Sequence, residues 1–308
     1  MQASLTQVLD ALNTVILGKE HQLRLILSCL MAKGHLLLED LPGMGKTTLS
    51  QALAKILGLG FSRIQFTSDL LPADVLGISI FDKDSSQFDF RPGPIFSQVV
   101  LADEINRATP KAQSALLEAM EEGQVTVDGQ THLLPKPFFV IATQNPHTQM
   151  GTFPLPEAQL DRFLMRVSLG YPSQEAEREI ILGLDRRSVI HQLTASLNLE
   201  EIFKIQLAIR QVHLAPALLD YVQRLVHFTR TDSAFSYGLS PRGTLGLVHC
   251  AQAWAFLWER DHVTPEDVQA VLPAVVGHRV TGLGEGTEME AGRLTQKLMT
   301  DVEVVGHE

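Results

Sequence analysis

The run Asp40-Leu41-Pro42-Gly43-Met44-Gly45-Lys46-Thr47 decides the fold of this 308-residue chain. The apolar segment Leu36-Leu37-Leu38 comes directly before it, and residues 48–57 after it have the spacing of a helix that stops at Gly58. A glycine loop between a strand and a helix is the arrangement that holds the phosphates of a nucleoside triphosphate. We therefore expect a parallel α/β sheet with a nucleotide bound at the end of its first strand.

Individual residues of this loop have predicted roles in binding the phosphates and Mg²⁺. Gly43 and Gly45 let the backbone turn its N–H groups inward, and the helix N-terminus adds the positive end of its dipole. Lys46 can reach the β- and γ-phosphates, and Thr47 can offer its hydroxyl to Mg²⁺. The motif GxxxxGK[ST] has a glycine where this chain has Asp40. The alternative is an ordinary glycine turn before a helix.

Composition sets limits on the class of protein. The chain is 45% hydrophobic and 19% charged, which suits one large globular domain or two. No apolar stretch approaches the ~20 residues of a membrane span, and the N-terminus lacks the pattern of a secretory signal. Cys29 and Cys250 are far apart without metal-ligand spacing, which predicts a reduced, cytoplasmic setting. The net charge of −10 argues against a nucleic-acid partner, although a ring pore can be locally basic.

The order of expected elements divides the chain in two. Residues 4–31 predict two helices, and strand-like apolar runs then alternate with helical patterns; these runs are 35–38, 61–66, 99–103, 138–143 and 163–169. Such alternation predicts a parallel sheet between helices. Beyond residue 172 only helical patterns follow, one that starts at residue 173 and others near 199–211, 215–229, 241–260, 264–276 and, after a loop at 281–286, 289–300. We therefore expect an αβα nucleotide-binding core over 1–172 and a smaller all-helical domain over 173–308.

Two carboxylates end the apolar run Val99-Val100-Leu101-Ala102. Asp103 is expected to hold Mg²⁺ through its water shell, and Glu104 to polarise the attacking water. Alternation along a strand directs the two side chains to opposite faces, so they can take different roles. Taken alone, this pattern is common in α/β proteins; its position beyond Lys46 favours function.

Three further polar residues are candidates for the reaction. Asn145, after the strand 138–143, can bond the γ-phosphate or the attacking water, or simply form a strand-end turn. Arg162 precedes a strand and can stabilise the charge on a neighbour's γ-phosphate, or pair with Asp161 on the surface. Arg242 lies in the first turn of a helix capped by Ser240, where the dipole disfavours a cation. It therefore either faces an anion or is solvated.

Two segments interrupt the alternation of strands and helices. Residues 84–96 break the sheet pattern, and residues 123–135 predict a β-hairpin with its turn at Asp128-Gly129. Either segment can face a pore or a partner, or be a plain connection.

Taken together, the motifs resemble those of the MoxR family of AAA+ ATPases over nearly all of residues 5–280. The residues that carry the resemblance are Leu37–Thr48, Ala102-Asp103-Glu104-Ile105-Asn106-Arg107-Ala108, Leu116–Glu122, Ala142-Thr143-Gln144-Asn145-Pro146, Leu155–Phe163 and Ser240-Pro241-Arg242. The resemblance implies a ring of six subunits with ATP and Mg²⁺ at each interface. It also implies that an acidic residue is tolerated at position 40.

The resemblance assigns roles to the candidate residues. Lys46 and Thr47 correspond to Walker A, and Asp103 and Glu104 to Walker B. The remaining three are sensor 1 (Asn145), an arginine finger that acts on the neighbour's ATP (Arg162) and sensor 2 in the helical lid (Arg242). Residues 84–96 resemble the helix-2 insert, 123–135 resemble the pre-sensor hairpin, and adenine is expected near Ile16-Leu17-Gly18. The expected nucleotide-binding residues are Gly18, Gly43, Met44, Gly45, Lys46, Thr47 and Thr48, and the expected metal-binding residues are Thr47 and Asp103.

The family implies a function that the residues alone do not. Its members are similar to chaperone-like remodellers that mature a client protein or insert a cofactor, often with a partner that bears a von Willebrand factor A domain. One alternative is a magnesium-chelatase-like motor subunit. Another is a DNA-dependent AAA+ motor, which predicts basic residues on the hairpin; residues 123–135 contain no lysine or arginine. A non-catalytic nucleotide switch is a further alternative.

Overall fold

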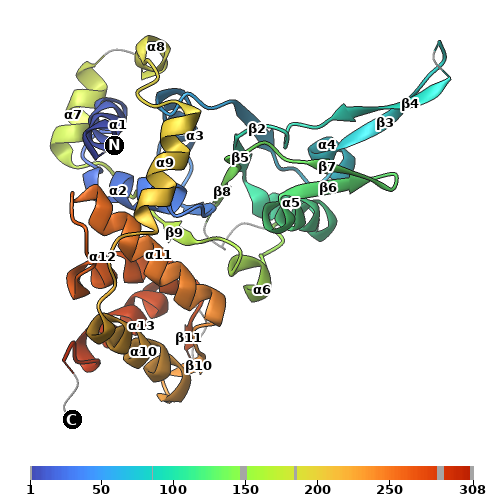
Figure 1. Ribbon diagram of the computed structural model, residues 1–308. Coiled ribbons are helices and arrows are strands. Elements are labelled where there is room, and N and C mark those ends of the chain that lie inside the picture. Colours follow the sequence, from blue (N-terminus) through green and yellow to red (C-terminus); the bar gives the residue numbers. More distant parts are fainter. Residues whose placement is uncertain (1, 85, 146–150, 184–185, 283–287, 306–308) are drawn as a thin grey trace.

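A five-stranded parallel sheet forms the centre of the first part of the chain. The computed structural model describes residues 2–84, 86–145, 151–183, 186–282 and 288–305 (Figure 1). The strands are β1 (Leu36–Glu39), β2 (Phe61–Gln65), β5 (Val99–Asp103), β8 (Phe139–Gln144) and β9 (Met165–Val167). They lie in the order β2-β5-β8-β1-β9, and all neighbouring pairs are parallel. The predicted α/β fold with five strands is confirmed.

The sheet is buried on both faces because its apolar side chains alternate between two cores. Leu36 and Leu38 join the core that contains α1 (Gln2–Val15), α2 (Glu20–Met31) and α3 (Lys46–Ile56). Leu37 belongs to the second core, on the side of α4 (Pro72–Leu76) and α5 (Pro110–Glu122). Because the strands are parallel, the residues that follow β1, β5 and β8 meet at one edge of the sheet.

Two antiparallel hairpins extend from the sheet domain toward the same side of the molecule (Figure 1). One pairs β3 (Gly77–Asp82) with β4 (Gln87–Pro92), and the other pairs β6 (Gln124–Val127) with β7 (Gln130–Leu133). The first hairpin begins at Gly77, well before the 84–96 segment that interrupts the sequence pattern. Gly77 has φ +104°, and an added Cβ would lie 2.3 Å from the carbonyl oxygen of Arg91, so only glycine fits the base of this hairpin.

Helices dominate the second part of the chain. They are α7 (Gln174–Leu182), α8 (Arg186–Gln192), α9 (Leu199–Ile209), α10 (Pro216–Thr231), α11 (Pro241–Leu257), α12 (Pro265–Val276) and α13 (Glu288–Asp301). The exception is a two-stranded pair, β10 (Phe235–Tyr237) and β11 (Thr281–Gly282). The start of the predicted 281–286 loop is therefore a strand, and the rest of that loop lies outside the described residues.

The region around residues 190–196 contacts α3 of the sheet domain. Lys55 Nζ, in the last turn of α3, donates to the carbonyl oxygen of Ile190 at 2.7 Å. The backbone N–H of Ser196 donates to the carbonyl oxygen of Ile56, also at 2.7 Å. Two short elements complete the sheet domain, the 3-10 turn Ile105–Arg107 and α6 (Glu157–Leu160).

The two cysteines are both fully buried and unpaired. Burial raises the pKa of the Cys29 thiol, and likewise that of Cys250. Both therefore pack as small apolar residues, in α2 and α11. Among the described residues, no helix has the length and hydropathy needed to cross a membrane.

Candidate nucleotide-binding site

The glycine loop has the backbone geometry of a phosphate cradle. Gly43 has φ +87° and Gly45 has φ +83°, and Gly45 caps the N-terminus of α3. A Cβ added to Gly43 would meet no atom within 4 Å, so the space in front of the loop is open. Met44, Thr47 and Thr48 are half-buried around it. Left-handed glycines at a helix N-terminus direct N–H groups toward an anion, so the loop fits a nucleotide phosphate.

Lys46 lies in the first turn of α3 and is 8% exposed. Its ammonium donates to the carbonyl oxygen of Asp40 at 2.6 Å and lies 3.5 Å from Oδ1 of Asn145. Burial lowers the pKa of Lys46, and the nearby carboxylates of Asp40, Asp103 and Glu104 oppose that change. A buried cation among carboxylates is suited to an incoming polyphosphate.

The Asp103 carboxylate, at the end of β5, is held on both oxygens. Oδ1 accepts a hydrogen bond from Thr143 Oγ1 at 2.6 Å. Oδ2 accepts from Arg63, at 2.6 Å from Nη2 and 3.1 Å from Nε. Within the described residues no cluster of three His, Cys, Asp or Glu side chains could hold a metal alone. A hydroxyl such as that of Thr47 and a carboxylate such as that of Asp103 are oxygen donors of the kind that Mg²⁺ prefers, together with phosphate and water.

Glu104 is held in an unusual conformation by several donors. Its φ is +56°, in the left-handed region that costs a non-glycine residue about 1–3 kcal/mol and is concentrated at functional sites. Oε1 accepts from Asn145 Nδ2 at 3.2 Å. Oε2 accepts from Gln65 Nε2 at 3.0 Å and from Arg107 Nη1 at 2.8 Å. The backbone N–H of Glu104 donates to Thr143 Oγ1 at 2.8 Å.

Lys46, Asp103, Glu104 and Asn145 therefore come together at one edge of the sheet. Sequence reasoning missed the residues that hold the two carboxylates, which are Arg63, Gln65, Arg107 and Thr143. A signal was available for Gln65 and Thr143, because both lie at the carboxyl ends of strands that neighbour β5.

Asp40 faces away from the cradle. Its carboxylate accepts from Leu169 N at 2.6 Å, from Ser168 Oγ at 2.8 Å and from Gly170 N at 2.9 Å. These donors belong to the chain that leaves β9 toward the lid. An aspartate at this position therefore ties the start of the phosphate loop to that exit, which a glycine cannot do.

The segment expected near adenine lies between the phosphate loop and α7. Ile16 is adjacent to the loop, because a Cβ on Gly45 would be 3.8 Å from its Cδ1. Gly18, with φ +67°, lies beside α7, because its added Cβ would be 3.4 Å from Ala176 Cβ. Lys19 Nζ donates to the carbonyl oxygen of Tyr171 at 2.7 Å.

Arg162 and Arg242 form a second group, separate from the phosphate loop. Both pair with the Glu121 carboxylate at the end of α5: Arg162 Nη2 lies 3.1 Å from Oε2, and Arg242 Nη2 bonds Oε1. Asp161 instead binds Arg279, so the expected alternative of an Asp161–Arg162 pair is wrong. The two arginines line a cavity of about 550 Å³ at the boundary of core and lid, and none of its lining residues comes from the phosphate loop.

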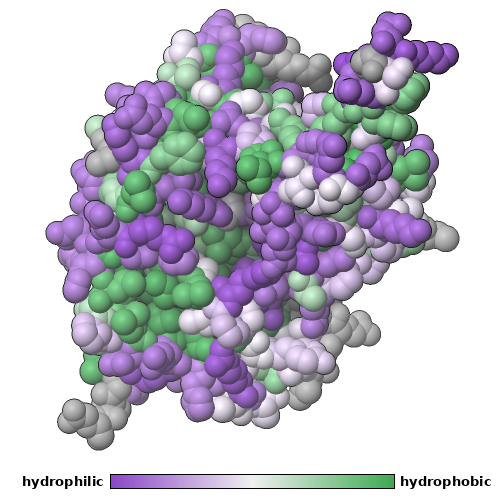
Figure 2. Space-filling model, turned by 45° about the vertical axis from the view of Figure 1, so that its right-hand side comes forward, coloured by the Kyte–Doolittle hydropathy of each residue, from purple (hydrophilic) through white to green (hydrophobic). Residues whose placement is uncertain are grey.

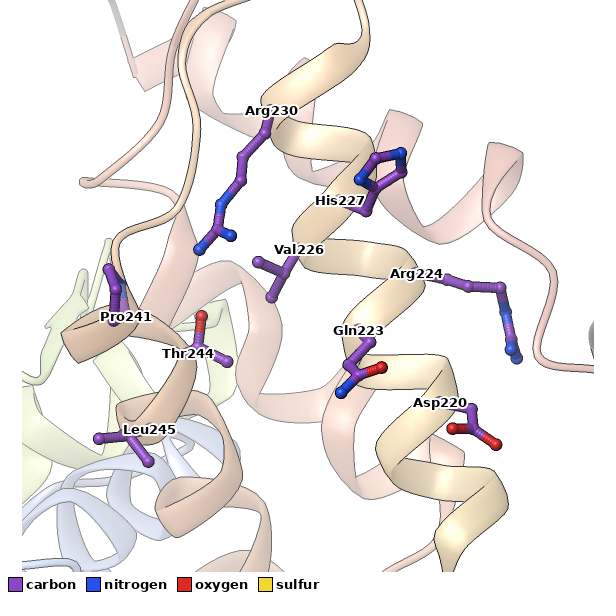
Figure 3. A pocket seen from close by; sticks show the side chains of 9 residues that line it. All are labelled: Asp220, Gln223, Arg224, Val226, His227, Arg230, Pro241, Thr244 and Leu245. Atoms are coloured by element: carbon purple, nitrogen blue, oxygen red, sulfur yellow. The ribbon is translucent and has the colours of Figure 1, made fainter.

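The turn before Arg242 is fixed by α10. Arg230 donates through Nε and Nη2 to the carbonyl oxygen of Leu239, at 3.1 and 2.9 Å, and Thr229 Oγ1 accepts from Leu239 N at 2.9 Å. Figure 3 shows Arg230 extending from α10 toward Pro241, across a hollow that the two helices share. Ser240 Oγ accepts from Gly243 N at 3.0 Å, which confirms the predicted cap. The first turn of α11 therefore has a fixed position relative to α10.

Comparisons with known proteins agree with this architecture. Residues 35–165 match the family described as "ATPase family associated with various cellular activities (AAA)", and residues 227–301 match an AAA lid domain. A crystal structure of a putative ATPase from Cytophaga hutchinsonii superposes with a TM-score of 0.89 at 36% sequence identity, covering 99% of this chain and 96% of that one. Fold and site together define an AAA+ ATPase with a helical lid.

The particular family follows from the relatives. The chain is 41% identical to Chaperone MoxR1 of Mycobacterium tuberculosis over 286 residues, or 90% of this chain and 75% of that protein. It is 33% identical to Protein MoxR of Paracoccus denitrificans over 299 residues, 88% of this chain and 86% of that one. Uncharacterized protein YeaC of Bacillus subtilis is 45% identical over 304 residues, 97% and 94% of the two chains. The chain belongs to the MoxR family of AAA+ ATPases.

Proposed function

We propose that this protein binds and hydrolyses ATP with Mg²⁺ and uses the energy to remodel or mature a client protein, including by cofactor insertion. The observation that carries the ATPase assignment is the Glu104 carboxylate, which three side chains hold beside the phosphate loop. The name of the relative Chaperone MoxR1 supports the client-directed part.

Each residue of the loop has a task in this proposal. The N–H groups of Gly43, Met44 and Gly45, with that of Thr48 at the helix start, bind phosphate oxygens. Lys46 exchanges its bond to the Asp40 carbonyl for the β- and γ-phosphates. Magnesium, when bound, neutralises phosphate charge, and Thr47 and Asp103 are its protein ligands. Gly18 borders the space for adenine.

Glu104 acts as the general base in this scheme. The hydrogen bonds donated by Asn145, Gln65 and Arg107 hold its carboxylate in one orientation. The amide of Asn145 contacts both Glu104 and Lys46. Because Lys46 binds the γ-phosphate in this scheme, Asn145 is positioned between the base and that phosphate. Removing a general base typically slows the reaction by about 10²–10⁴-fold.

Arg162 and Arg242 serve the ATP of a neighbouring subunit. Their cavity contains no residue of their own phosphate loop, and both side chains point to one shared carboxylate, Glu121. A terminal phosphate from an adjacent subunit offers the same pair a stronger anion. This geometry supports a ring in which each interface holds one ATP, and we propose six subunits from the family resemblance.

The projecting hairpin β3–β4 supports contact with a protein. Ile78, Ile80, Phe81 and Phe88 are large apolar side chains that are 45–72% exposed along it, and Phe81 and Phe88 contact edge to face at 5.3 Å. Figure 2 shows this projection at the upper right, with hydrophobic residues on its surface. Exposed apolar surface of this kind marks interaction sites. We propose the client, or a partner with a von Willebrand factor A domain, as its ligand.

The test of this function uses Glu104→Gln, which keeps the shape of the side chain and removes the base. The variant is expected to bind ATP with Mg²⁺ in titration calorimetry as the unchanged protein does, and to hydrolyse it about 100-fold or more slowly. ATP-loaded Glu104→Gln should also retain clients in affinity purification, and the Lys46→Ala protein is the matched control that does not load. Undiminished turnover by Glu104→Gln would remove the assigned base.

A further inference from the structure

Arg279 of the lid uses all three guanidinium nitrogens to hold the chain around Arg162. Its side chain is 3% exposed. Nε donates to Asp161 Oδ1 at 2.7 Å, and Nη2 donates to the carbonyl oxygens of Asp161 and Phe163 at 3.1 and 2.6 Å. Nη1 donates to the carbonyl oxygens of Leu164, at 3.0 Å, and Val275. These five contacts equal the five N–H donors of an arginine.

Four of the five acceptors lie in the short run 161–164. Arg162 lies inside that run, so its backbone has carbonyls fixed on both sides by one rigid, planar group. A second contact strengthens the hold, because the ring Nε2 of His278 lies 2.9 Å from the carbonyl oxygen of Phe163. His278 and Arg279 follow Gly277, the C-cap of α12, and fall within the region that matches the AAA lid domain.

Leu164 shows how closely the two parts approach at this point. A Cβ added to Gly34, between α2 and β1, would lie 2.1 Å from Leu164 Cδ2, and one added to Gly246 of α11 would lie 2.8 Å from its Cδ1. Leu164 therefore fills a gap that two glycines leave open, one in the core and one in the lid. The run 161–164 has little freedom to shift relative to α12 while these contacts exist.

We propose that Arg279 is the positioning residue for Arg162, so that the lid of one subunit sets how its arginine reaches the ATP of the next. The inference rests on the proposed action of Arg162 on a neighbouring subunit. Lysine cannot replace Arg279, because an ammonium has only three N–H donors on one atom. It cannot reach both the four acceptors in the run 161–164 and the carbonyl oxygen of Val275. The Arg279→Lys variant therefore keeps the charge and loses the geometry.

A complementation experiment separates this role from general support of the fold. Lys46→Ala subunits cannot load ATP and have an intact Arg162, whereas Arg162→Ala subunits load ATP and lack the arginine. In a mixture, activity recovers only at interfaces where a Lys46→Ala subunit supplies Arg162 to ATP bound by an Arg162→Ala subunit. Arg279→Lys is then placed in one parent or in the other.

The expected result depends on which parent has the substitution. In the Lys46→Ala parent, Arg279→Lys lowers the recovered kcat about 10-fold or more with little change in KM, because the supplied Arg162 is misplaced. In the Arg162→Ala parent the same substitution leaves the recovered rate within about twofold, since that subunit supplies no arginine. Equal losses in both placements would show a structural role and overturn the proposal.

Two controls keep the result interpretable. Melting temperature and hydrodynamic size establish that each mixture is folded and assembled. Asp161→Ala replaces Arg279→Lys if that variant does not fold; it removes one contact of Arg279 and also the contact of Asp161 with Ser240. Asp161→Ala is expected to lower the recovered kcat in the Lys46→Ala parent and to leave it nearly unchanged in the Arg162→Ala parent. Equal effects in both parents would overturn the proposal. If mixing the Lys46→Ala and Arg162→Ala proteins restores no activity, Arg162 does not act on a neighbouring subunit. The proposed role of Arg279 is then contradicted as well.

Discussion

At the scale of single residues, Asp40 replaces the first glycine of the general phosphate-loop motif, and its contacts explain the replacement. Its three hydrogen bonds join the loop to the exit of β9. A charged acceptor that serves buried N–H groups contributes more than a neutral one. The departure therefore stabilises the boundary between the sheet and the lid, and leaves the cradle itself unchanged.

We expect Asp40→Gly, although it restores the common glycine, to lower the free energy of unfolding by about 3 kcal/mol, because the N–H groups of Leu169 and Gly170 lose their acceptor. Chemical denaturation of the ATP-free protein measures the change. Asp40→Asn, which keeps one carbonyl oxygen, is the matched control and should lose less. A glycine variant as stable as the unchanged protein would contradict this account.

The residues to which we assign chemistry are easier to predict from the sequence than the residues that contact them. Lys46 and Glu104 follow from short local patterns, a glycine loop and an apolar run ending in carboxylates. The contacts of Glu104 with Gln65 and of Asp103 with Arg63 depend on β2 lying beside β5, and the sequence does not give the order of the strands. The pairing of Arg162 and Arg242 with Glu121 could not be predicted either, because it joins three segments that are far apart in the sequence.

At the scale of secondary structure, long periodic segments were predicted and short pairings were not. The strands β1, β5 and β8 follow from continuous apolar runs, which are buried throughout and need no partner to be recognised. In contrast, β3 exposes Ile78, Ile80 and Phe81, so it lacks the burial pattern of a strand and extends the projecting hairpin beyond the predicted 84–96 segment. The strands β10 and β11 have two or three residues each, and their residues pair across more than 40 positions of sequence, for example Phe235 with Gly282, which leaves no local signal.

The hairpin β6–β7 provides a test against action on DNA. Residues 123–135 contain no lysine or arginine, and Thr126 and Thr131 face each other across the strands with their hydroxyls 3.2 Å apart. We therefore expect single-stranded DNA neither to bind this protein nor to stimulate its ATP hydrolysis at physiological salt. Filter binding over a range of salt concentrations measures this. Tight binding that weakens steeply as salt rises would favour a DNA-dependent motor instead.

At the scale of the whole molecule, the separation of Arg162 from the phosphate loop predicts cooperation between subunits. We expect Arg162→Ala subunits, mixed in increasing proportion with unchanged subunits, to lower ATPase activity below the weighted average of the two proteins, because each one disables a neighbour's site. Steady-state assays across the mixing series measure the curve. Lys204→Ala, which removes an exposed cation on α9 that does not line the cavity of Arg162, is the matched control. Strictly additive activities would contradict action across the interface.

The global stability of the protein should also depend on pH through His35. Its Nδ1 accepts from Val140 N at 3.0 Å and its Nε2 faces the Met120 carbonyl at 3.2 Å, so the ring is neutral; the residue is partly buried. Burial lowers the pKa of His35 from 6.5 to about 4. The pKa of His35 is lower in the folded than in the unfolded protein. The contribution of His35 to the free energy of unfolding is therefore complete above pH 6.5 and is lost as the pH falls toward 4. The loss amounts to about 3 kcal/mol.

Denaturation at several pH values between 7.5 and 4 measures this dependence. His35→Gln, whose amide can accept from Val140 and donate to Met120 without titrating, should have a shallower decline over the same range. Burial lowers the pKa of His278 as well, so part of the dependence should remain in that variant. Identical slopes for the two proteins would contradict the assignment to His35.

The burial of Cys29 and Cys250 has a practical consequence for following the motions of this machine. Both native thiols are enclosed and protonated, so maleimide dyes should leave the folded protein unmodified. A pair of cysteines introduced at exposed sites on the β3–β4 hairpin and on α10 would then be the sole points of attachment. Fluorescence energy transfer could report the distance between hairpin and lid through each round of nucleotide turnover, in an otherwise native background.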